Sequence, residues 1–575
     1  MSTQVFSLTP SGDTGKAPGM RLNPHALTPL RRRTRRWRTA LACGLIPIMA
    51  AACSGATGAA GPVGPPKPGG SLTVAIDTGI TGLDPNVAAS AQEARVLRQL
   101  YDSLVATTPD GTKQVPWLAS AWTISPDGKT YTFTLRDGVT FHDGTPFDAG
   151  AVCFNLDRIA DPSTGSVFAI GAIGPYKSCA ATAPNTAVVT LSAPYAPFLA
   201  NLSSPFLGMV SPTAVRAEGA QAFRLKPVGT GPYKFVSYTT NDRIVLARND
   251  SYAWGPAGAG HSGPAYLDTL TFQIIPDATV RMGSLRSGAV QMVGNVPETQ
   301  VSAVQNDSTL HFYKQNQSGS PFQLHFNTAK APWGDPALRR AIRSGFDVAS
   351  AVKSLYFGVY DRAWSPLSPS TSGYDRTVEN SWQFNANAAR SALDALGWVP
   401  GADGIRQRDG QRLSITYLEA SPNREKRQDI AEFFKQNMKD IGVEVTVKLV
   451  QTAPLQAAIQ AGDYDIVGLS LVNIDPNVLY SVYSSKFVPK PQALGFNMAR
   501  VSDPALDGEL LAAQQDLDRT SRMAKYSALQ KEITQDAFSI PVYVPTYTAA
   551  TGAGVAGLRF DAEGYPIFYD TYLAS

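Results

Sequence analysis

Apolar and polar positions from Ser71 onward switch between strand-like alternation and helical spacing. Residues 71–76 have the pattern of a short strand, and residues 93–104 carry apolar side chains at helical spacing. Two alternating segments, 122–124 and 131–136, flank a Ser-Pro-Asp-Gly turn signal, which predicts a hairpin. Strands and helices interchange in this way down to the C-terminus. The pattern therefore predicts a mixed α/β protein.

Two local patterns predict how particular side chains are used. Asp143-Gly144 predicts a tight turn, and Asp148 stands where the N-cap of the next helix is expected. In residues 337–346, apolar and basic side chains separate onto two faces of a predicted helix. We expect the apolar face to be buried and the basic face to meet water. The basic residues are Arg339, Arg340 and Arg343.

The N-terminus has the layout of an export signal. The arginine-rich segment 31–38 precedes an apolar run, 41–52, which is too short for a membrane span of about 20 residues. Ala50-Ala51-Ala52-Cys53 resembles a bacterial lipobox, in which a signal peptidase cuts before a cysteine that then carries lipid. We therefore expect residues 1–53 to be a lipoprotein signal peptide, with Cys53 as the lipidation site.

Some alternatives at this end of the chain stay open. Either Met1 or Met20 can be the start, and export can follow the general secretory or the twin-arginine route. An ordinary signal peptide, with Cys53 incidental, is the other interpretation of the cysteine. Residues 54–70 are rich in Gly, Pro and Ala and predict a flexible tether.

The formal net charge of +4 comes from the N-terminus. Eight of the 50 Lys and Arg residues, but one of the 46 Asp and Glu residues, lie before Cys53, which leaves a net charge of −3 afterwards. Such a body does not favour nucleic acid as a partner.

The part of the chain after Cys53 contains two cysteines, Cys153 and Cys179. An even pair in an exported protein predicts a disulfide. Two buried free thiols are the alternative.

The sequence contains no complete motif of the enzyme classes considered below. Asp127-Gly128-Lys129-Thr130 ends like a phosphate-binding loop, but Thr123 occupies the position of the required first glycine. The five histidines have no paired metal-ligand spacing, and no Gly-x-Ser-x-Gly motif occurs. We therefore expect no catalytic residue, no metal, no cofactor and no enzymatic activity.

Motifs spread over residues 71–575 resemble, in their order, the extracellular solute-binding proteins of the dipeptide, oligopeptide and nickel ABC importers. The motifs are LDPN (83–86), QLYDSL (99–104), the run from Pro116 to Val152, VGTGPYKFVSY (228–238), LDTLTFQIIPDATVR (267–281), FNTAKAPWGDPALRRAI (326–342), LGWVPGADGIRQRDGQRLSITYL (396–418), KDIGVEVTVKLV (439–450) and ITQDAFSIPVYVP (533–545). The ordered set identifies the chain as a candidate member of this family, solute-binding protein family 5.

The resemblance implies a fold. Members have two α/β lobes in a clamshell of the type II periplasmic-binding-protein kind, with an extra β-rich subdomain in lobe I. Lobe I is then expected at 71–271 with the subdomain near 105–225, and lobe II at 272–540, while 541–575 return to lobe I. The chain is expected to cross between the lobes near 273–275 and 541–543.

The resemblance also implies a function. We expect a monomeric lipoprotein, anchored on the extracytoplasmic face of the cell membrane, that captures a peptide or peptide-like solute between its lobes. It would deliver this ligand to an ABC permease with cytoplasmic ATPase subunits. A non-peptide ligand, such as an oligosaccharide or a metal chelate, and a ligand-presenting sensor component are alternatives. An extracytoplasmic hydrolase is disfavoured because no nucleophile–base motif is present.

The family pattern also bears on the kind of ligand. In dipeptide-binding members, an Asp near an Asp-Pro pair binds the α-ammonium group of the peptide, and an upstream Arg binds its carboxylate. Aligned on Asp475-Pro476, the Asp position holds Val472, and the Arg position falls near Ser421, with Arg424 or Arg427 as alternatives. Because Val472 cannot compensate a buried ammonium group, we expect free zwitterionic dipeptides to bind poorly.

The expected ligand-binding residues lie in two loops and at two single positions. Trp364 is an aromatic candidate taken from the residues alone, for which packing is the other explanation. The full set is Gly79, Ile80, Thr81, Gly82, Trp364, Ser421, Leu471, Val472 and Asn473.

Overall fold

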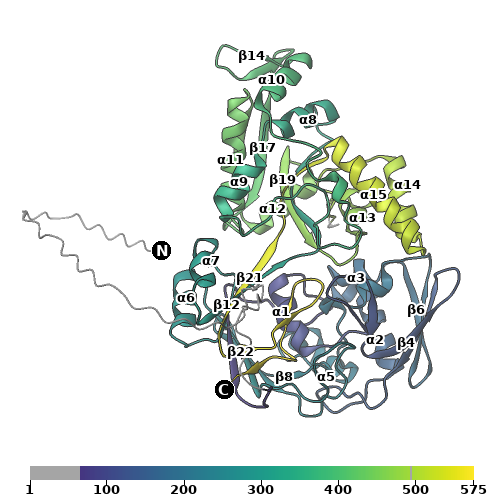
Figure 1. The fold of residues 1–575 in the computed structure, drawn as a ribbon. Helices are drawn as coiled ribbons and strands as arrows, with labels where there is room; N and C mark the ends of the chain where they lie inside the picture. The colour runs from purple at the N-terminus through teal and green to yellow at the C-terminus, as the bar shows by residue number, and fades with distance from the viewer. Residues whose placement is uncertain (1–64, 492–494, 575) are drawn as a thin grey trace, which may run out of the picture. The chain divides into compact units, whose positions relative to one another are not determined.

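Two main β-sheets organise residues 65–491 and 495–574, which are the residues that the computed structural model describes. The predicted signal peptide, Cys53 and most of the tether lie outside them. We define lobe I as the part built on a seven-stranded sheet and lobe II as the part built on a five-stranded sheet (Figure 1). None of the described helices combines the length and the apolar character that crossing a membrane requires.

The sheet of lobe I has the strand order β12-β21-β11-β1-β10-β9-β8. Strand β1 pairs in parallel with β10 and β11, while β21 runs antiparallel to β11 and β12. The strands are β1 (Ser71–Ile76), β8 (Tyr233–Thr239), β9 (Arg243–Arg248), β10 (Thr269–Ile274), β11 (Met292–Gly294), β12 (Leu310–Asn316) and β21 (Thr546–Gly552). The helices α6 (Ala278–Arg286) and α7 (Glu298–Gln305) and the short pairs β22 (Val555–Ala556) with β25 (Tyr572–Leu573) and β23 (Arg559–Phe560) with β24 (Pro566–Ile567) complete this part.

Helix α1 (Ala91–Leu100) follows β1 and begins with a capping box. The Ser90 hydroxyl accepts from the Glu93 backbone, and the Glu93 carboxylate accepts from the Ser90 backbone. The helix ends at Leu100, four residues before the end that the apolar spacing predicts. The Leu100 carbonyl accepts a hydrogen bond from the Gly231 N–H at 3.0 Å, so tertiary contacts, rather than the periodicity, set this end.

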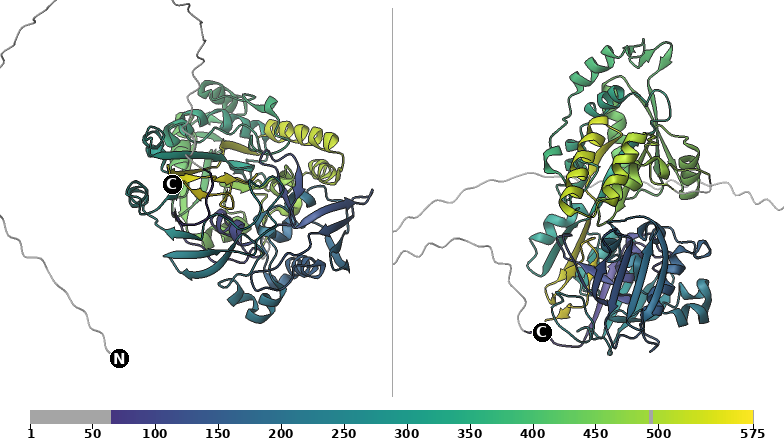
Figure 2. Two further views of the ribbon diagram at one scale, coloured as in Figure 1. Left: turned by 60° about the horizontal axis from the view of Figure 1, so that its bottom comes forward. Right: turned by 90° about the vertical axis from the view of Figure 1, so that its right-hand side faces the viewer.

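A separate four-stranded sheet, in the order β4-β5-β7-β6, occupies the region where the β-rich subdomain is expected (Figure 2, blue). The predicted hairpin forms between β4 and β5, and Asp148 caps α2 as predicted. Buried residues of this sheet and of the seven-stranded sheet share one hydrophobic core. The elements are β2 (Val105–Thr107), β3 (Gln114–Pro116), β4 (Ala119–Ile124), β5 (Thr130–Leu135), α2 (Ala149–Ala160), α3 (Ala169–Ala172), β6 (Tyr176–Ala183), β7 (Thr186–Leu191), α4 (Phe198–Asn201) and α5 (Pro212–Phe223).

The sheet of lobe II has the order β18-β17-β19-β13-β20. Helices α9 and α11 lie beside it, and α14 packs along α15 (Figure 1). The strands are β13 (Gly319–Phe326), β17 (Ser414–Ala420), β18 (Glu444–Val450), β19 (Ile466–Val472) and β20 (Ser539–Tyr543), with a small sheet of β14 (Val399–Pro400), β15 (Arg406–Arg408) and β16 (Gln411–Arg412). The helices are α8 (Pro336–Ser344), α9 (Val348–Tyr356), α10 (Ala386–Ala395), α11 (Arg427–Asp440), α12 (Thr452–Ala461), α13 (Val478–Tyr483), α14 (Pro504–Gln515) and α15 (Arg519–Asp536).

Two of the three arginines on the basic face of α8 do not meet water as the sequence predicts, while Arg340 stays partly exposed. Arg339 and Arg343 are 2% and 7% exposed. Arg339 donates to the Asp536 carbonyl at 2.7 Å, and Arg343 donates to the Thr534 carbonyl. These carbonyls lie in the last turn of α15, where a helix has unsatisfied acceptors and favours positive charge. The expectation that these two arginines face water is therefore wrong, because they donate hydrogen bonds to the last turn of α15.

The chain passes between the two sheets later than the sequence predicts. Strands β11 and β12 still pair in the seven-stranded sheet, so lobe I does not end at 271 and the first crossing lies at Gln317-Ser318, not near 273–275. The second crossing lies at Val544-Pro545, because β20 belongs to the sheet of lobe II through Tyr543. The Gln317 N–H donates to the Pro545 carbonyl at 2.8 Å, so the two crossings lie side by side.

A disulfide joins Cys153 of α2 to Cys179 of β6, with 5.0 Å between the Cα atoms. It links the helix and the outer strand of the four-stranded sheet. The two cysteines are 26 residues apart in the sequence, so the bond restricts a loop of moderate length in the unfolded chain.

We predict that replacing both cysteines (Cys153→Ser with Cys179→Ser) lowers the free energy of unfolding by about 3.5 kcal/mol, the loop-closure contribution for such a loop. Urea unfolding of the mature body is the measurement. Reduction of the wild type is the control, because it should cause the same loss and leave the double variant unaffected. Equal urea midpoints for the oxidised wild type and the double variant would contradict the prediction.

Candidate ligand-binding site

A cavity of about 160 Å³ lies in lobe I and includes one wall residue of lobe II. That residue is Ile474, in the loop between β19 and α13. The wall is mostly apolar and contains a few charged side chains, which is the usual make-up of a small-ligand site. The larger aromatic and aliphatic members are Val115, Trp117, Tyr252, Ile474, Phe560, Ile567 and Tyr569.

Three connections of lobe I supply most of the remaining wall, to which Arg98 of α1, Ser203 and Pro232 also contribute. They are the hairpin of β2 and β3, the loop 256–259, and the C-terminal hairpin of β23 and β24 with its continuation to Asp570. Beneath the wall, the buried Asp102 carboxylate accepts hydrogen bonds from Tyr252 at 3.1 Å and from Trp254 at 2.9 Å. These bonds hold the Tyr252 ring in place at the cavity.

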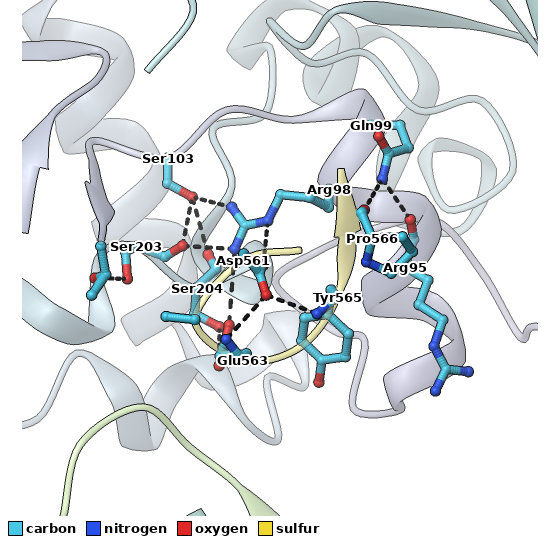
Figure 3. Close-up of polar contacts among 12 residues, drawn as sticks. Arg95, Arg98, Gln99, Ser103, Ser203, Ser204, Asp561, Glu563, Tyr565 and Pro566 are labelled. Carbon is cyan, nitrogen blue, oxygen red and sulfur yellow. Dashed lines mark hydrogen bonds and ion pairs between the residues drawn. The ribbon is translucent and has the colours of Figure 1, made fainter. Parts of the chain in front are cut away.

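Arg98 of α1 is the cation at the centre of the polar part of the wall (Figure 3). Its Nε lies 2.9 Å from Asp561 Oδ2, and its Nη2 lies 3.8 Å from Glu563 Oε2. Nη2 also donates to the Ser203 carbonyl at 2.8 Å. Arg98 is 4% exposed, so its guanidinium is desolvated and must be compensated by these partners.

The β23–β24 hairpin presents both carboxylates to Arg98. Asp561 Oδ1 accepts from the backbone N–H groups of Glu563 at 3.0 Å and Tyr565 at 2.8 Å, which closes the turn. Gly564 supplies the left-handed backbone conformation, with φ of +86°. Ser204 donates to Glu563 Oε1 at 3.3 Å from the other side. The turn therefore fixes Glu563 between Ser204 and Arg98.

The protonation of Glu563 is set by burial. Desolvation, together with the charge of Asp561, raises the pKa of Glu563 to about 8, although Arg98 acts in the opposite direction. Elsewhere in the wall, Arg559 pairs with Asp570 at 3.0 Å, and Asp570 also accepts from the Gly260 N–H. Among the described residues, no group of three His, Cys, Asp or Glu side chains is arranged to hold a metal ion.

The loop Gly79–Gly82, expected to contact the ligand, packs on lobe I outside the cavity wall. The Thr81 hydroxyl donates to Glu93, and the Ile80 carbonyl accepts from Tyr238 at 2.8 Å. A side chain at Gly79 would meet Asn241, and one at Gly82 would meet Arg224. The structure therefore places these four residues against α1, α5 and the β8–β9 hairpin.

Trp364 and Ser421 both lie in lobe II and outside the cavity wall. Trp364 packs against the core of lobe II, with the Arg362 guanidinium over its ring and Trp382 at 5.8 Å between ring centroids. Ser421 follows β17, and its N–H donates to the Val450 carbonyl at 2.8 Å. Packing therefore accounts for Trp364 in this structure.

The segment Leu471–Asn473 lies beside the first crossing and next to the cavity. The Asn473 N–H donates to the Ser318 carbonyl at 3.2 Å, and the Ser318 hydroxyl donates to the Ala562 carbonyl at 3.3 Å. Val472 packs against the core of lobe I, so this part of lobe II touches lobe I directly. None of the three residues is in the wall, but the adjacent Ile474 is.

Arg427, the alternative for the missing family arginine, is already neutralised. Its Nη2 lies 2.8 Å from Glu425 Oε2 and donates to the Ser470 hydroxyl at 2.9 Å. Burial alone would raise the pKa of Glu425, but the charges of Arg427 and Arg424 lower it to about 2. Glu425 therefore already supplies the negative charge that compensates Arg427.

The ionic cluster of Arg98, Asp561 and Glu563 was not among the residues predicted from the sequence. One signal was available, because Asp561-Ala562-Glu563-Gly564 combines a turn signal with two acids between apolar residues. The burial of Arg98 could not be predicted from its local sequence, since a basic residue in a predicted helix is ordinarily assigned to the solvent face. Its partners lie 463 and 465 residues further along the chain, and no local pattern joins them.

Comparison with known proteins links these features to a family. The family model for bacterial extracellular solute-binding proteins, family 5, matches residues 113–489. The glutathione-binding protein GsiB of Pectobacterium atrosepticum is 27% identical over 477 residues, which are 81% of this chain and 86% of GsiB. Protein XP55 of Streptomyces lividans is 30% identical over 443 residues, with 76% of this chain and 77% of XP55 covered.

Solved structures share the fold. The periplasmic binding protein DppA of Helicobacter pylori, in complex with the peptide STSA, has a TM-score of 0.73 and 26% identity and covers 88% of this chain and 99% of its own. NikA of Brucella suis, in complex with Fe(III)-EDTA, has a TM-score of 0.78 at 24% identity and covers 88% of this chain and all of its own. The predicted two-lobe fold is confirmed. With its match over residues 113–489, the chain belongs to the bacterial extracellular solute-binding proteins of family 5.

Proposed function

We propose that this protein captures a peptide or peptide-like solute between its two lobes, with one group of the ligand in the cavity beside Ile474, and delivers it to the permease of an ABC importer, whose ATPase subunits lie in the cytoplasm. The observation that carries the proposal is the composition of the wall, in which a surface of lobe I is completed by a residue of lobe II. A ligand there contacts both lobes, so its binding favours the conformation in which they meet.

Contacts far from the crossings support a form in which the lobes meet. The Ala196 N–H of the β-rich subdomain donates to the Gln514 carbonyl of α14 at 3.0 Å. Arg519 of α15 donates to the Thr112 carbonyl at 2.6 Å. These few polar contacts are weak enough to be broken and remade, which is what capture and release of a solute require.

The choice of a peptide rests on the relatives, and the choice of peptide type rests on this chain. GsiB is a glutathione-binding protein, and DppA holds a peptide. Here Val472 offers no charge, Arg427 is neutralised by Glu425, and both cavity arginines are paired with carboxylates. A free dipeptide would have to bury its terminal carboxylate without a free cation in the cavity wall. We therefore propose a longer or end-blocked peptide, held through its backbone and apolar groups.

Titration calorimetry of the mature body tests this proposal. The pools are free dipeptides, N-acetylated peptide amides, free hexapeptides, oligosaccharides and metal chelates. We expect micromolar binding for the blocked or longer peptides and at least tenfold weaker binding for free dipeptides. Micromolar binding of ordinary free dipeptides would contradict the proposed ligand type. Binding of the sugar or chelate pool alone would replace the peptide by that ligand.

We also propose that the protein is held at the extracytoplasmic face of the cell membrane by lipid on Cys53, as a monomer. The family is extracellular, and the described helices offer no membrane span. Stable anchoring by lipid takes more than one acyl chain, which a lipidated N-terminal cysteine supplies. The tether at 54–70 would keep the body close to the permease.

Cys53→Ala should abolish lipid attachment, because no other lipidation motif is evident in the sequence. Incorporation of labelled palmitate in the producing cells is the measurement. Cys43→Ala is the matched control, since Cys43 lies within the predicted signal peptide and its loss should leave labelling unchanged. Undiminished palmitate on the Cys53→Ala protein would show that the anchor is elsewhere.

A further inference from the structure

The charged groups in the cavity wall do not balance. Two arginines, Arg98 and Arg559, face three carboxyl groups, those of Asp561, Glu563 and Asp570. Arg98 makes its short contact with Asp561 at 2.9 Å, and Arg559 makes its contact with Asp570 at 3.0 Å. Glu563 is thus the carboxyl group left without a close cation.

Glu563 is buried but incompletely satisfied. It is 3% exposed, and its nearest cationic nitrogen is 3.8 Å away on Arg98. Its Oε1 accepts the 3.3 Å bond from Ser204, while its Oε2 receives no hydrogen bond from the described residues (Figure 3). A buried carboxylate in this position would be under-compensated, so the group favours either a proton or an added cation.

The cavity has room for a single small group. Its volume of about 160 Å³ is close to that of a protein cavity that takes up one benzene molecule, about 150 Å³. The wall is mostly apolar and includes the aromatic side chains of Trp117, Tyr252 and Tyr569. A positive charge on an apolar stem matches both features, because the stem fills the apolar part and the charge meets the carboxylate.

We propose that this cavity is a subsite for one primary ammonium group on a short alkyl stem, such as a lysine side chain of the peptide, with Glu563 as its counter-charge. The proposal rests on the proposed function and specifies one ligand group. The ligand needs no carboxylate of its own in this cavity, because Arg98 and Arg559 are already paired with protein carboxylates.

Ligand binding at this subsite releases a proton. In the empty cavity burial raises the pKa of Glu563 to about 8, so the group is mostly protonated at pH 7. An ammonium group beside it favours the carboxylate, whose proton passes to solvent while the ligand keeps its own charge. Affinity therefore rises with pH between about 6 and 8 and levels off above the pKa of the free site.

Other charged and titratable groups face Glu563 or the cavity and define the background for this effect. Arg98 comes from α1, and Asp561 and Tyr565 come from the same hairpin as Glu563, while the 203–204 segment offers serines alone. The remaining groups at the cavity wall are Tyr252, Arg559, Tyr569 and Asp570, and His261 adjoins Asp570 at 2.9 Å. Beneath the wall lies Asp102, which accepts from Tyr252 at 3.1 Å and whose pKa burial raises to about 7.

The test uses two N-acetylated tetrapeptide amides that differ at one position, lysine in one and norleucine in the other, with apolar residues elsewhere. Calorimetry at pH 7 in phosphate and in Tris reports both affinity and protons exchanged. For the wild type we expect the lysine peptide to bind at least tenfold more tightly and to release close to one proton. Glu563→Gln should remove the preference and the proton release and still bind the norleucine peptide.

Glu532→Gln is the matched control. Glu532 is a carboxyl group of α15 whose pKa burial raises to about 7, and it lies outside the cavity wall, so this variant should behave as the wild type. Equal affinity of the wild type for the two peptides, or an unchanged lysine preference in Glu563→Gln, would overturn the subsite. Absence of binding by either peptide, and by every peptide pool above, would instead contradict the proposed function.

Discussion

The backbone hydrogen bond from Gln317 to Pro545 joins the two places where the chain passes between the sheets. Because the crossings lie side by side, the lobes are linked along one line and can rotate about it with few dihedral changes. Gly319, just after the first crossing, has φ of +107°, and a Cβ there would lie 2.2 Å from the Leu471 carbonyl. This close approach brings the end of β19 against the crossing and so places Ile474 at the cavity.

The arrangement of charged groups in the cavity depends on the same close contact at the first crossing. Ser318 reaches the β23–β24 hairpin through Ala562, and that hairpin holds Asp561 and Glu563 against Arg98. Burying one arginine with two carboxyl groups is unfavourable unless one of them stays neutral or gains a cation. The fold therefore builds a site whose charge state depends on its occupant, and it does so with groups from the two ends of the chain.

Local patterns predicted those features that local chemistry decides. Asp148 caps α2, Cys153 pairs with Cys179, and Ser-Pro-Asp-Gly closes the β4–β5 hairpin. Features that depend on contacts between residues far apart in the chain could not be predicted from local patterns. Arg339 turns inward because the end of α15 needs donors, and the first crossing follows β12 because β12 pairs with a strand that comes 230 residues later. The ionic cluster of Arg98 could not be predicted for the same reason. The expectation that Leu471–Asn473 contact the ligand came from a resemblance and stays a prediction.

In the proposed function, a small solute brings the two lobes together. Small-angle scattering of the mature body, with and without a ligand that calorimetry shows to saturate it, measures this closure. We expect a smaller radius of gyration in the complex, together with a higher melting temperature because only the native state binds. A saturating ligand that leaves the radius of gyration unchanged would contradict it.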